Sequence, residues 1–287
     1  MVICAMNCQL VDLHTHSTCS DGALNPTDLL LRAAGAGVEH FAITDHDTIA
    51  GLEEGAQAAK ANGVSFYSGV ELSCVWQGVT IHILCYGFDV KCSHMAELCQ
   101  HQEAMRLQRA SIIAEKLERK FSMSGLLELA MFKSEGGAPG RPHFASAMVD
   151  SGLVDSTATA FKKYLGNGKV GDVKALWPNL EELMLQVGHP GWITSLAHPR
   201  KYDMTVSKLK RLLLDFTKSG GKGLEVSTSG QKQGEIGLLS DICRQFGLCA
   251  SEGSDFHAPG MPWSEVGKHS GLPRNIPSVL SLLEPVN

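Results

Sequence analysis

Residues 12–17 read DLHTHS and are followed by SDG at residues 20–22. The short apolar run before His14 indicates the end of a buried strand. A two-residue step along a strand points His14 and His16 to the same side. Asp21 in the following loop adds an anionic oxygen, and such a mixture of nitrogen and oxygen donors suits zinc, manganese or iron better than calcium. This stretch therefore predicts a metal site whose other ligands lie elsewhere in the chain.

The composition is that of a globular protein. Of the 287 residues, 44% are hydrophobic and 19% are charged, which excludes the disordered and fibrous classes. The formal net charge is -5, so a broad basic groove for long nucleic acid is not expected. A local basic pocket is compatible with this charge. Any nucleic acid that the protein binds is accordingly expected to be short.

The nine cysteines include no Cys-x-x-Cys pair. In a chain of this length we interpret them as reduced residues rather than as a disulfide framework. The N-terminus lacks the pattern of a signal peptide, and no later segment approaches the roughly 18 apolar residues of a membrane span. We therefore expect a cytoplasmic protein without a membrane partner. The sequence leaves its oligomeric state open.

Strands and helices alternate over the first third of the chain. Apolar runs at 41–44, 64–67 and 81–84 predict three strands after the first one, with helical stretches between them. Polar residues follow the strand ends. This rhythm favours an α/β fold with a parallel barrel or sheet and an active site at one rim.

The alternation of strands and helices stops between residues 95 and 173, where predicted helices follow one another without a strand. We interpret this segment as a helical insertion over the active site. Residues 1–94 and 174–287 would then form the barrel that carries it. Three further apolar strands after the insertion lead back to polar strand ends.

Histidines and acids gather at or just after the expected strands. The set comprises His14, His16, Asp21, Asp45, His46, Glu71, His82, His198, Asp255 and His257, with His143 from the insertion. Because these donors exceed what one four- or five-coordinate ion can use, the site should hold two or three metal ions. Three dications bring about six positive charges, which the carboxylates offset only in part, so a phosphate dianion would bind between them. Phosphoester hydrolysis is the chemistry that such a site favours.

The order of these motifs resembles the PHP (polymerase and histidinol phosphatase) family. After the opening stretch the series continues through TDHD at 44–47, GVE at 69–71, the His82 strand, RPHF at 141–144, AHP at 197–199 and GSDFH at 253–257. FKKYL at 161–165 and SDFHAP at 254–259 are similar to the branch of RNase AM and the 3',5'-nucleoside bisphosphate phosphatases. The resemblance covers nearly the whole chain. It implies a distorted (β/α)7 barrel with a trinuclear site, with manganese as the expected ion and zinc or iron as alternatives.

The resemblance also implies a role for each residue of the site. One ion would be held by His14, His16, Glu71 and Asp255, a second by Asp21, His46 and His257, and a third by Glu71, His82 and His143. Glu71 would bridge the ions. His198 would contact phosphate or donate a proton, so His198 and Asp255 are the expected catalytic residues.

Substrate contacts are expected from basic residues near the site. Arg141 would neutralise a substrate phosphate through its planar fork. Relatives in this branch usually follow His-Pro with Gly-Arg-Tyr, whereas this chain has Arg200-Lys201-Tyr202, and many carry Gly-Tyr where it has Gly171-Asp172. Because both departures lie on the expected substrate side, Arg200 and Lys201 join His198 and Arg141 as expected substrate-binding residues.

The implied activity is that of a metal-dependent phosphoric ester hydrolase. It would remove the 3'-phosphate of nucleoside 3',5'-bisphosphates and trim short RNA from its 5' end as an exoribonuclease. One alternative is a histidinol-phosphatase-like or other small phosphomonoester phosphatase. A second is an amidohydrolase, although that fold usually has a bridging lysine where this chain offers Glu71. A third is a PHP module kept only as a scaffold, which the complete ligand set disfavours.

Overall fold

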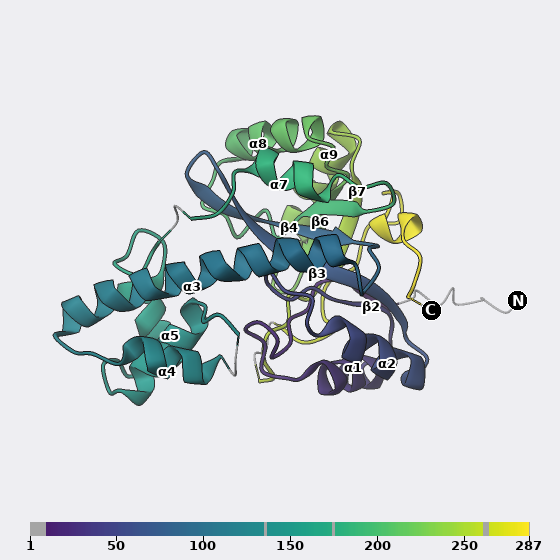
Figure 1. The fold of residues 1–287 in the computed structure, drawn as a ribbon. Coiled ribbons are helices and arrows are strands. Elements are labelled where there is room, and N and C mark those ends of the chain that lie inside the picture. The colour runs from purple at the N-terminus through teal and green to yellow at the C-terminus, as the bar shows by residue number, and fades with distance from the viewer. Residues whose placement is uncertain (1–9, 135–136, 174–175, 261–263, 287) are drawn as a thin grey trace, which may run out of the picture.

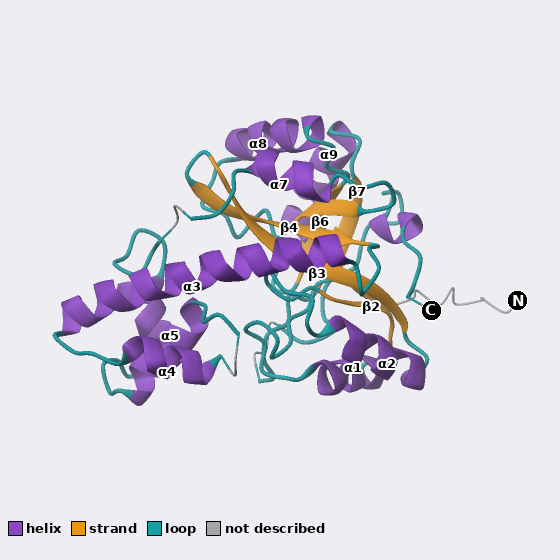
Figure 2. Cartoon of the chain, viewed as in Figure 1, coloured by secondary structure: helices purple, strands orange, loops and turns teal. Residues whose placement is uncertain are grey.

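The computed structural model describes residues 10–134, 137–173, 176–260 and 264–286. At its centre is one seven-stranded sheet whose strands lie side by side in sequence order (Figures 1 and 2). The strands are β1 (Leu10–Asp12), β2 (Val38–Ile43), β3 (Ser65–Trp76), β4 (Val79–Tyr86), β5 (Ile193–Leu196), β6 (Gly223–Thr228) and β7 (Cys249–Gly253). A parallel-rich sheet flanked by helices confirms the expected α/β fold class.

The two edges of the sheet meet just beyond β1 and β7. The backbone N–H of Leu13 donates to the carbonyl of Glu252 at 3.0 Å, and that of Asp255 donates to the carbonyl of His14 at 2.7 Å. These bonds link the segments at the ends of the first and last strands; they do not by themselves close the sheet into the expected distorted barrel. They also place the histidine pair at the start of the chain beside the acid near its end.

β3 and β4 form a hairpin, which departs from a purely parallel arrangement. Gln77 (φ 46°) and Gly78 (φ 75°) both lie in the left-handed region, as a two-residue type I′ turn requires. β4 is antiparallel to both β3 and β5, and the other neighbouring pairs are parallel. The strand predicted at 64–67 is therefore shorter than the observed strand β3, which continues to Trp76. Glu71 stands in mid-strand rather than at a strand end.

Five helices cover the outside of the sheet. They are α1 (Pro26–Gly35), α2 (Leu52–Asn62), α7 (Leu180–Val187), α8 (Val206–Lys218) and α9 (Gln233–Gln245). Figure 1 shows α1 and α2 on one side of the sheet, and α7, α8 and α9 on the other. Their apolar faces, which include Leu29, Leu183 and Phe216, pack into the main core. A short 3₁₀ helix, Val279–Leu282, lies near the C-terminus.

The region between β4 and α7 is helical. It contains α3 (Ser93–Phe121), α4 (Leu126–Lys133), α5 (Arg141–Asp150), α6 (Thr157–Ala160) and a π-helical turn, Phe161–Leu165. Ile113, Leu117 and Phe144 belong to a hydrophobic cluster separate from the main core. The first turns of α3 pack in the main core instead, through Met95 and Cys99. The long helix α3 thus belongs to both cores (Figure 1).

Within the described ranges, no helix combines the length and the apolar character that crossing a membrane would take.

Candidate metal centre

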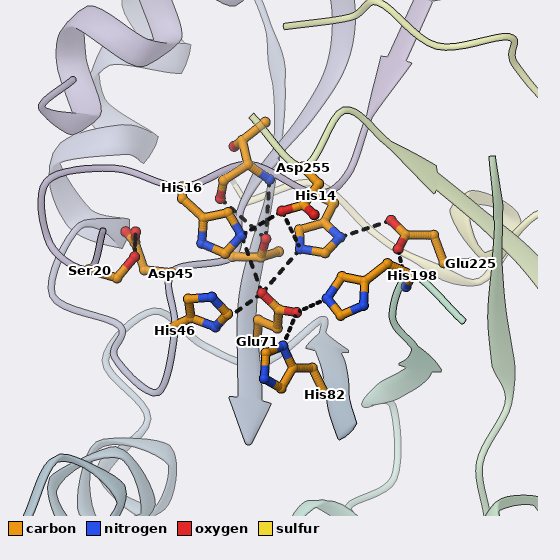
Figure 3. Close-up of polar contacts among 12 residues, drawn as sticks. His14, His16, Ser20, Asp45, His46, Glu71, His82, His198, Glu225 and Asp255 are labelled. Atoms are coloured by element: carbon orange, nitrogen blue, oxygen red, sulfur yellow. Dashed lines mark hydrogen bonds and ion pairs between the residues drawn. The ribbon is translucent and has the colours of Figure 1, made fainter. Parts of the chain in front are cut away.

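The expected ligands come from strands far apart in sequence and converge on one carboxylate. His14 and His16 follow β1, His46 follows β2, His82 lies in β4, His198 follows β5, and Asp255 and His257 follow β7. Glu71 of β3 is at the centre of the cluster (Figure 3). Its Oε2 lies 3.2 Å from Nε2 of both His14 and His16, and its Oε1 lies 2.8 Å from Nδ1 of His82.

The donor atoms form four groups, in each of which all atoms lie within 4.8 Å of one another. The groups are His16, Asp21, His46 and His257; His14, Glu71 and His198; His14, His16 and Asp255; and His46, Glu71 and His82. Asp21, His46 and His257, which are expected to share one ion, are found in one group. Glu71 takes part in two groups, as a bridging ligand would.

His143 does not join any of these groups among the described residues. Its Nδ1 accepts a hydrogen bond from the backbone N–H of Gly140 at 2.9 Å. It lines a small cavity together with Asp21 and His46. Its ligation of a metal therefore stays a prediction.

His198 lies inside the cluster rather than beside it. Its Nε2 is 2.8 Å from Oε1 of Glu71. Its φ of 25° is unusual for a residue with a side chain, so the surrounding contacts must hold this conformation. The position suits a metal ligand as well as the expected phosphate contact or proton donor.

Several buried donor atoms have no hydrogen-bond partner. They include Nδ1 of His16 and Nδ1 of His198. Nε2 of His16, Oδ1 of Asp21 and Nδ1 of His46 also make no hydrogen bond, although each lies at ion-pair distance from a neighbouring side chain of the cluster. Buried polar atoms are nearly always satisfied in folded proteins, so these atoms call for a ligand. Because the donors are imidazole nitrogens and carboxylate oxygens, the residues fit manganese, zinc or iron.

The carboxylates of the cluster are held in their ionised form. Burial opposes the ionisation of Glu71, but His46 and His14 hold its pKa well below its ordinary value. Burial also opposes that of Asp21, whose pKa His257 and His46 lower well below the ordinary value. Both groups are therefore anionic at neutral pH, the state that binds metal ions.

Glu225 is a member of the site that the sequence interpretation missed. It is fully buried, and its Oε1 lies 2.8 Å from Nδ1 of His14. Its Oε2 accepts a hydrogen bond from the backbone N–H of His198 at 2.5 Å. The sequence feature that could have identified Glu225 is its position as a single acid within the apolar run GLEV at 223–226.

Asp45 supports the site without facing the metal groups. Its Oδ1 accepts a hydrogen bond from the backbone N–H of Ser17 at 2.7 Å. It also accepts one from the hydroxyl of Ser20 at 2.6 Å (Figure 3). Both bonds fix the loop that carries Asp21.

Arg106 and Asp47 form a second feature that sequence interpretation missed. Nε of Arg106 in α3 donates to Oδ2 of Asp47 at 2.6 Å. Oδ1 of Asp47 accepts from the backbone N–H of Ser73 in β3 at 2.7 Å. Asp47 directly follows His46, so this contact joins α3 to a loop of the metal site.

A cavity of about 430 Å³ opens from the metal groups toward the helical region. Its lining includes Asp21, His46, His82 and His198 of the metal groups, and also Lys201, Arg106, Arg109, Arg141, Phe161 and Trp177. Among the expected substrate-binding residues, Arg141, His198 and Lys201 thus line the cavity. Lys201 also forms an ion pair with Asp255. Arg200 donates instead to Glu235 at 3.2 Å and does not line this cavity.

This architecture is that of a PHP domain: the family model matches residues 12–229, and the chain belongs to the PHP domain family. The expected resemblance is thereby confirmed. The chain is 40% identical over 277 residues to the 5'-3' exoribonuclease Rnm of Escherichia coli (strain K12), covering 96% of this chain and 94% of that relative. It is 39% identical to a 3',5'-nucleoside bisphosphate phosphatase of Chromobacterium violaceum, covering 92% of each.

A solved structure from Chromobacterium violaceum, described as an amidohydrolase with bound sulfate and no metal, has the same fold. Its TM-score to this chain is 0.87 at 37% identity, and the match covers 97% of this chain and 99% of that one.

Proposed function

We propose that the protein is a metal-dependent phosphoesterase that hydrolyses the 3'-phosphate of nucleoside 3',5'-bisphosphates. By the same hydrolysis it would remove nucleotides from the 5' end of short RNA. The observation that carries this proposal is the group of buried and half-buried imidazole and carboxylate donors around Glu71, some of which line a cavity together with three arginines. The names of the relatives from Escherichia coli and Chromobacterium violaceum support it.

The metal centre would supply Lewis acidity toward phosphoryl oxygens and a nucleophilic water at neutral pH. We propose manganese, as two or three ions. The three carboxylates Asp21, Glu71 and Asp255 would hold them, together with His14, His16, His46, His82 and His257. His143 is kept as a further candidate ligand.

The side chains that line the cavity would each interact with a substrate phosphate in a different way. His198 would donate a proton to the leaving oxygen or contact the phosphate, since its Nε2 already lies beside Glu71 at 2.8 Å. Lys201 lines the same cavity and would release Asp255 when that carboxylate binds metal. Arg141 would then face substrate oxygens from the helical side. Arg200 is the weakest of the expected contacts, because it pairs with Glu235.

We also propose a cytoplasmic location, which is supported by the seven unpaired cysteines among the described residues. The substrate would be small, because the cavity has a volume of about 430 Å³. Residues 95–173 would form the insertion that closes over it. A histidinol-phosphatase-like activity remains the nearest alternative within the family. The amidohydrolase alternative is disfavoured because Glu71 occupies the centre of the cluster, where that class usually has a lysine.

The test is phosphate release from adenosine 3',5'-bisphosphate with added Mn²⁺. A 5'-phosphorylated RNA of a few nucleotides and histidinol phosphate are assayed beside it. Release from the bisphosphate, mononucleotides from the RNA, and loss of both with a chelator are the expected results. Turnover of histidinol phosphate alone would overturn the proposed substrate and leave the metal site standing. Absence of turnover on all three would support a scaffold role.

A further inference from the structure

Four of the candidate metal ligands lie on two segments that meet where the ends of the sheet approach each other. His14 and His16 follow β1, and Asp255 and His257 follow β7. Among the described residues, β1 and β7 are the two outer strands of the sheet, and no ladder of paired residues joins them. Single backbone bonds link the two segments instead, such as that from the N–H of His16 to the carbonyl of Phe256 at 2.9 Å. The position of one ligand pair relative to the other therefore depends on local contacts.

The carboxylate of Asp12 makes several of these contacts and joins three segments. Asp12 is fully buried. Its Oδ1 accepts a hydrogen bond from the backbone N–H of Ser254 at 2.8 Å and a longer one from that of His14 at 3.4 Å. Its Oδ2 accepts from the backbone N–H of Gly267 at 2.7 Å. Because Ser254 directly precedes Asp255, this one side chain holds the backbone beside both ligand pairs.

Two glycines allow the backbones around Asp12 to approach this closely. A Cβ at Gly253, the last residue of β7, would lie 2.5 Å from the backbone nitrogen of His14. Gly267 has a φ of 70°, and a Cβ there would lie 2.9 Å from Cγ2 of Val38. Such short contacts would force the segments apart, so a side chain is not accommodated at either position. Glycine is thus present on two of the segments that Asp12 joins.

Asp12 acts on the backbone rather than on the metal donors. Within the described part of the chain it belongs to none of the four donor groups, whereas Glu225 contacts the His14 ring itself. Ligand atoms lie about 2.0–2.2 Å from an ion, which places neighbouring ligand atoms roughly 3–3.5 Å apart. Oδ1 of Asp255 lies 3.5 and 3.2 Å from Nε2 of His14 and His16, so the donors already have this spacing. Separation of the two segments would take Asp255 out of this range.

We propose that Asp12 is a positioning residue of the metal centre. By holding the backbone at Ser254 against that at His14, it sets the separation between the histidine pair and Asp255. It thereby sets the affinity for the ion that these ligands would share. This inference rests on the proposed function, because it takes the two segments to bind a common ion. Groups that position metal ligands typically contribute roughly 10- to 100-fold to metal affinity, so loss of this carboxylate should have an effect in that range.

Asp12→Asn tests the inference with little change in shape. The amide has one oxygen where the carboxylate has two, so either Ser254 or Gly267 loses the acceptor for its N–H. Calorimetric titration should show that Mn²⁺ binding is weakened by about tenfold or more. A variant that is folded by circular dichroism and binds Mn²⁺ as tightly as the wild type would overturn the proposal.

Glu252→Gln is the matched control, because it also replaces a buried acid near the end of β7. Glu252 is 8% exposed, and its Oε2 lies 3.6 Å from Nδ1 of His269. It is absent from the four donor groups found among the described residues. The control variant should have a lower melting temperature and the Mn²⁺ affinity of the wild type. An equal loss of affinity in Glu252→Gln and Asp12→Asn would show a general loss of stability and overturn the positioning role.

Gly267→Ala makes the same test from the donor side, and it decides the matter if Asp12→Asn does not fold. It keeps the carboxylate of Asp12 but displaces the N–H that bonds to Oδ2. Mn²⁺ affinity should fall by about two- to tenfold, the range of one hydrogen bond. Unchanged affinity in a folded Gly267→Ala variant would likewise overturn the proposal.

Binding and turnover together separate this inference from the proposed function. If the wild type binds Mn²⁺, Asp12→Asn binds it weakly, and none of the three assayed substrates is cleaved, the proposed function fails while the positioning role stands. If the wild type releases phosphate from adenosine 3',5'-bisphosphate and Asp12→Asn keeps its Mn²⁺ affinity, the function stands and the positioning role is wrong.

Discussion

Oε1 of Glu225 lies 2.8 Å from Nδ1 of His14, and the other oxygen of the same carboxylate accepts from the backbone N–H of His198. One buried acid thus orients histidines that follow two different strands, β1 and β5. The contact fixes the Nδ1–H form of the His14 ring, which leaves Nε2 free to face Glu71 and a metal ion.

Glu225→Gln should weaken metal binding without removing a ligand. An amide supports the His14 ring less well than a carboxylate, and changes of this kind typically reduce metal affinity by roughly 10- to 100-fold. Calorimetric titration with Mn²⁺ measures the effect. Glu97→Gln, an exposed acid on α3, is the control. Equal affinities for Glu225→Gln and wild type would show that Glu225 has only a packing role.

Asp255→Asn should abolish turnover of the bisphosphate while the fold is retained. The carboxylate is buried beside His14 and His16, at 3.5 and 3.2 Å from their Nε2 atoms, so its charge is needed by an ion held there. Phosphate release measures activity, and circular dichroism checks the fold. A folded variant with near-normal rates would contradict the assignment of Asp255 to the metal centre.

Arg106→Met should destabilise the protein by about 3 kcal/mol, because it leaves the buried Asp47 carboxylate without its cation. The side chains are 13% and 0% exposed, so solvent screens the pair little. For a chain of this size the melting temperature should fall by roughly 6–12 °C. Thermal unfolding measures this fall, and the double variant with Asp47→Asn should recover part of it. A melting temperature equal to that of wild type would show that the pair is not needed.

Metal binding should release protons and strengthen as pH rises. Burial opposes protonation of His16, but Asp255 and Glu71 raise its pKa from 6.5 to about 10 in the metal-free protein. The protonated ring therefore stabilises the metal-free fold fully below pH 6.5, and this contribution is lost as pH rises through about 10. A metal ion needs the neutral ring, so each pH unit between 6.5 and 8.5 should increase Mn²⁺ affinity by roughly tenfold per proton released.

The measurement is a Mn²⁺ titration at three pH values, repeated in buffers of different ionisation enthalpy to count the protons. An affinity that does not change with pH would mean that His16 is already neutral before the ion binds.

The proximity of most side chains in the candidate metal centre could be predicted from sequence because they follow short apolar strands. A strand of this kind ends at a defined rim, so His14, His16 and His46 had to lie near one another. Glu71 was identified for the same reason, although it lies in mid-strand. The Gln77-Gly78 turn, which extends β3 into a hairpin, lacks the Asn-Gly pattern that marks such turns most clearly.

The supporting contacts could not be predicted in the same way. Arg106 is one of several charges spaced along a long helix, and its pairing with Asp47 spans 59 positions that no periodicity relates. The place of His198 inside the cluster depends on an unusual backbone conformation, with φ of 25°, which the motif AHP does not reveal. Such details depend on how strands and helices pack, and local patterns carry little information about that.

The 29 residues of α3 would extend about 44 Å at 1.5 Å per residue. Its first turns pack in the main core through Met95 and Cys99. Its C-terminal half packs with α4 and α5 in the second hydrophobic cluster. An exchange of the helical region between two family members at residue 95 would therefore divide the main core, to which Met95 and Cys99 belong. A segment that can be exchanged begins farther along the helix. Arg106 and Arg109 lie between the two cores, so in such a chimaera the residues around them from one family member must be compatible with those from the other.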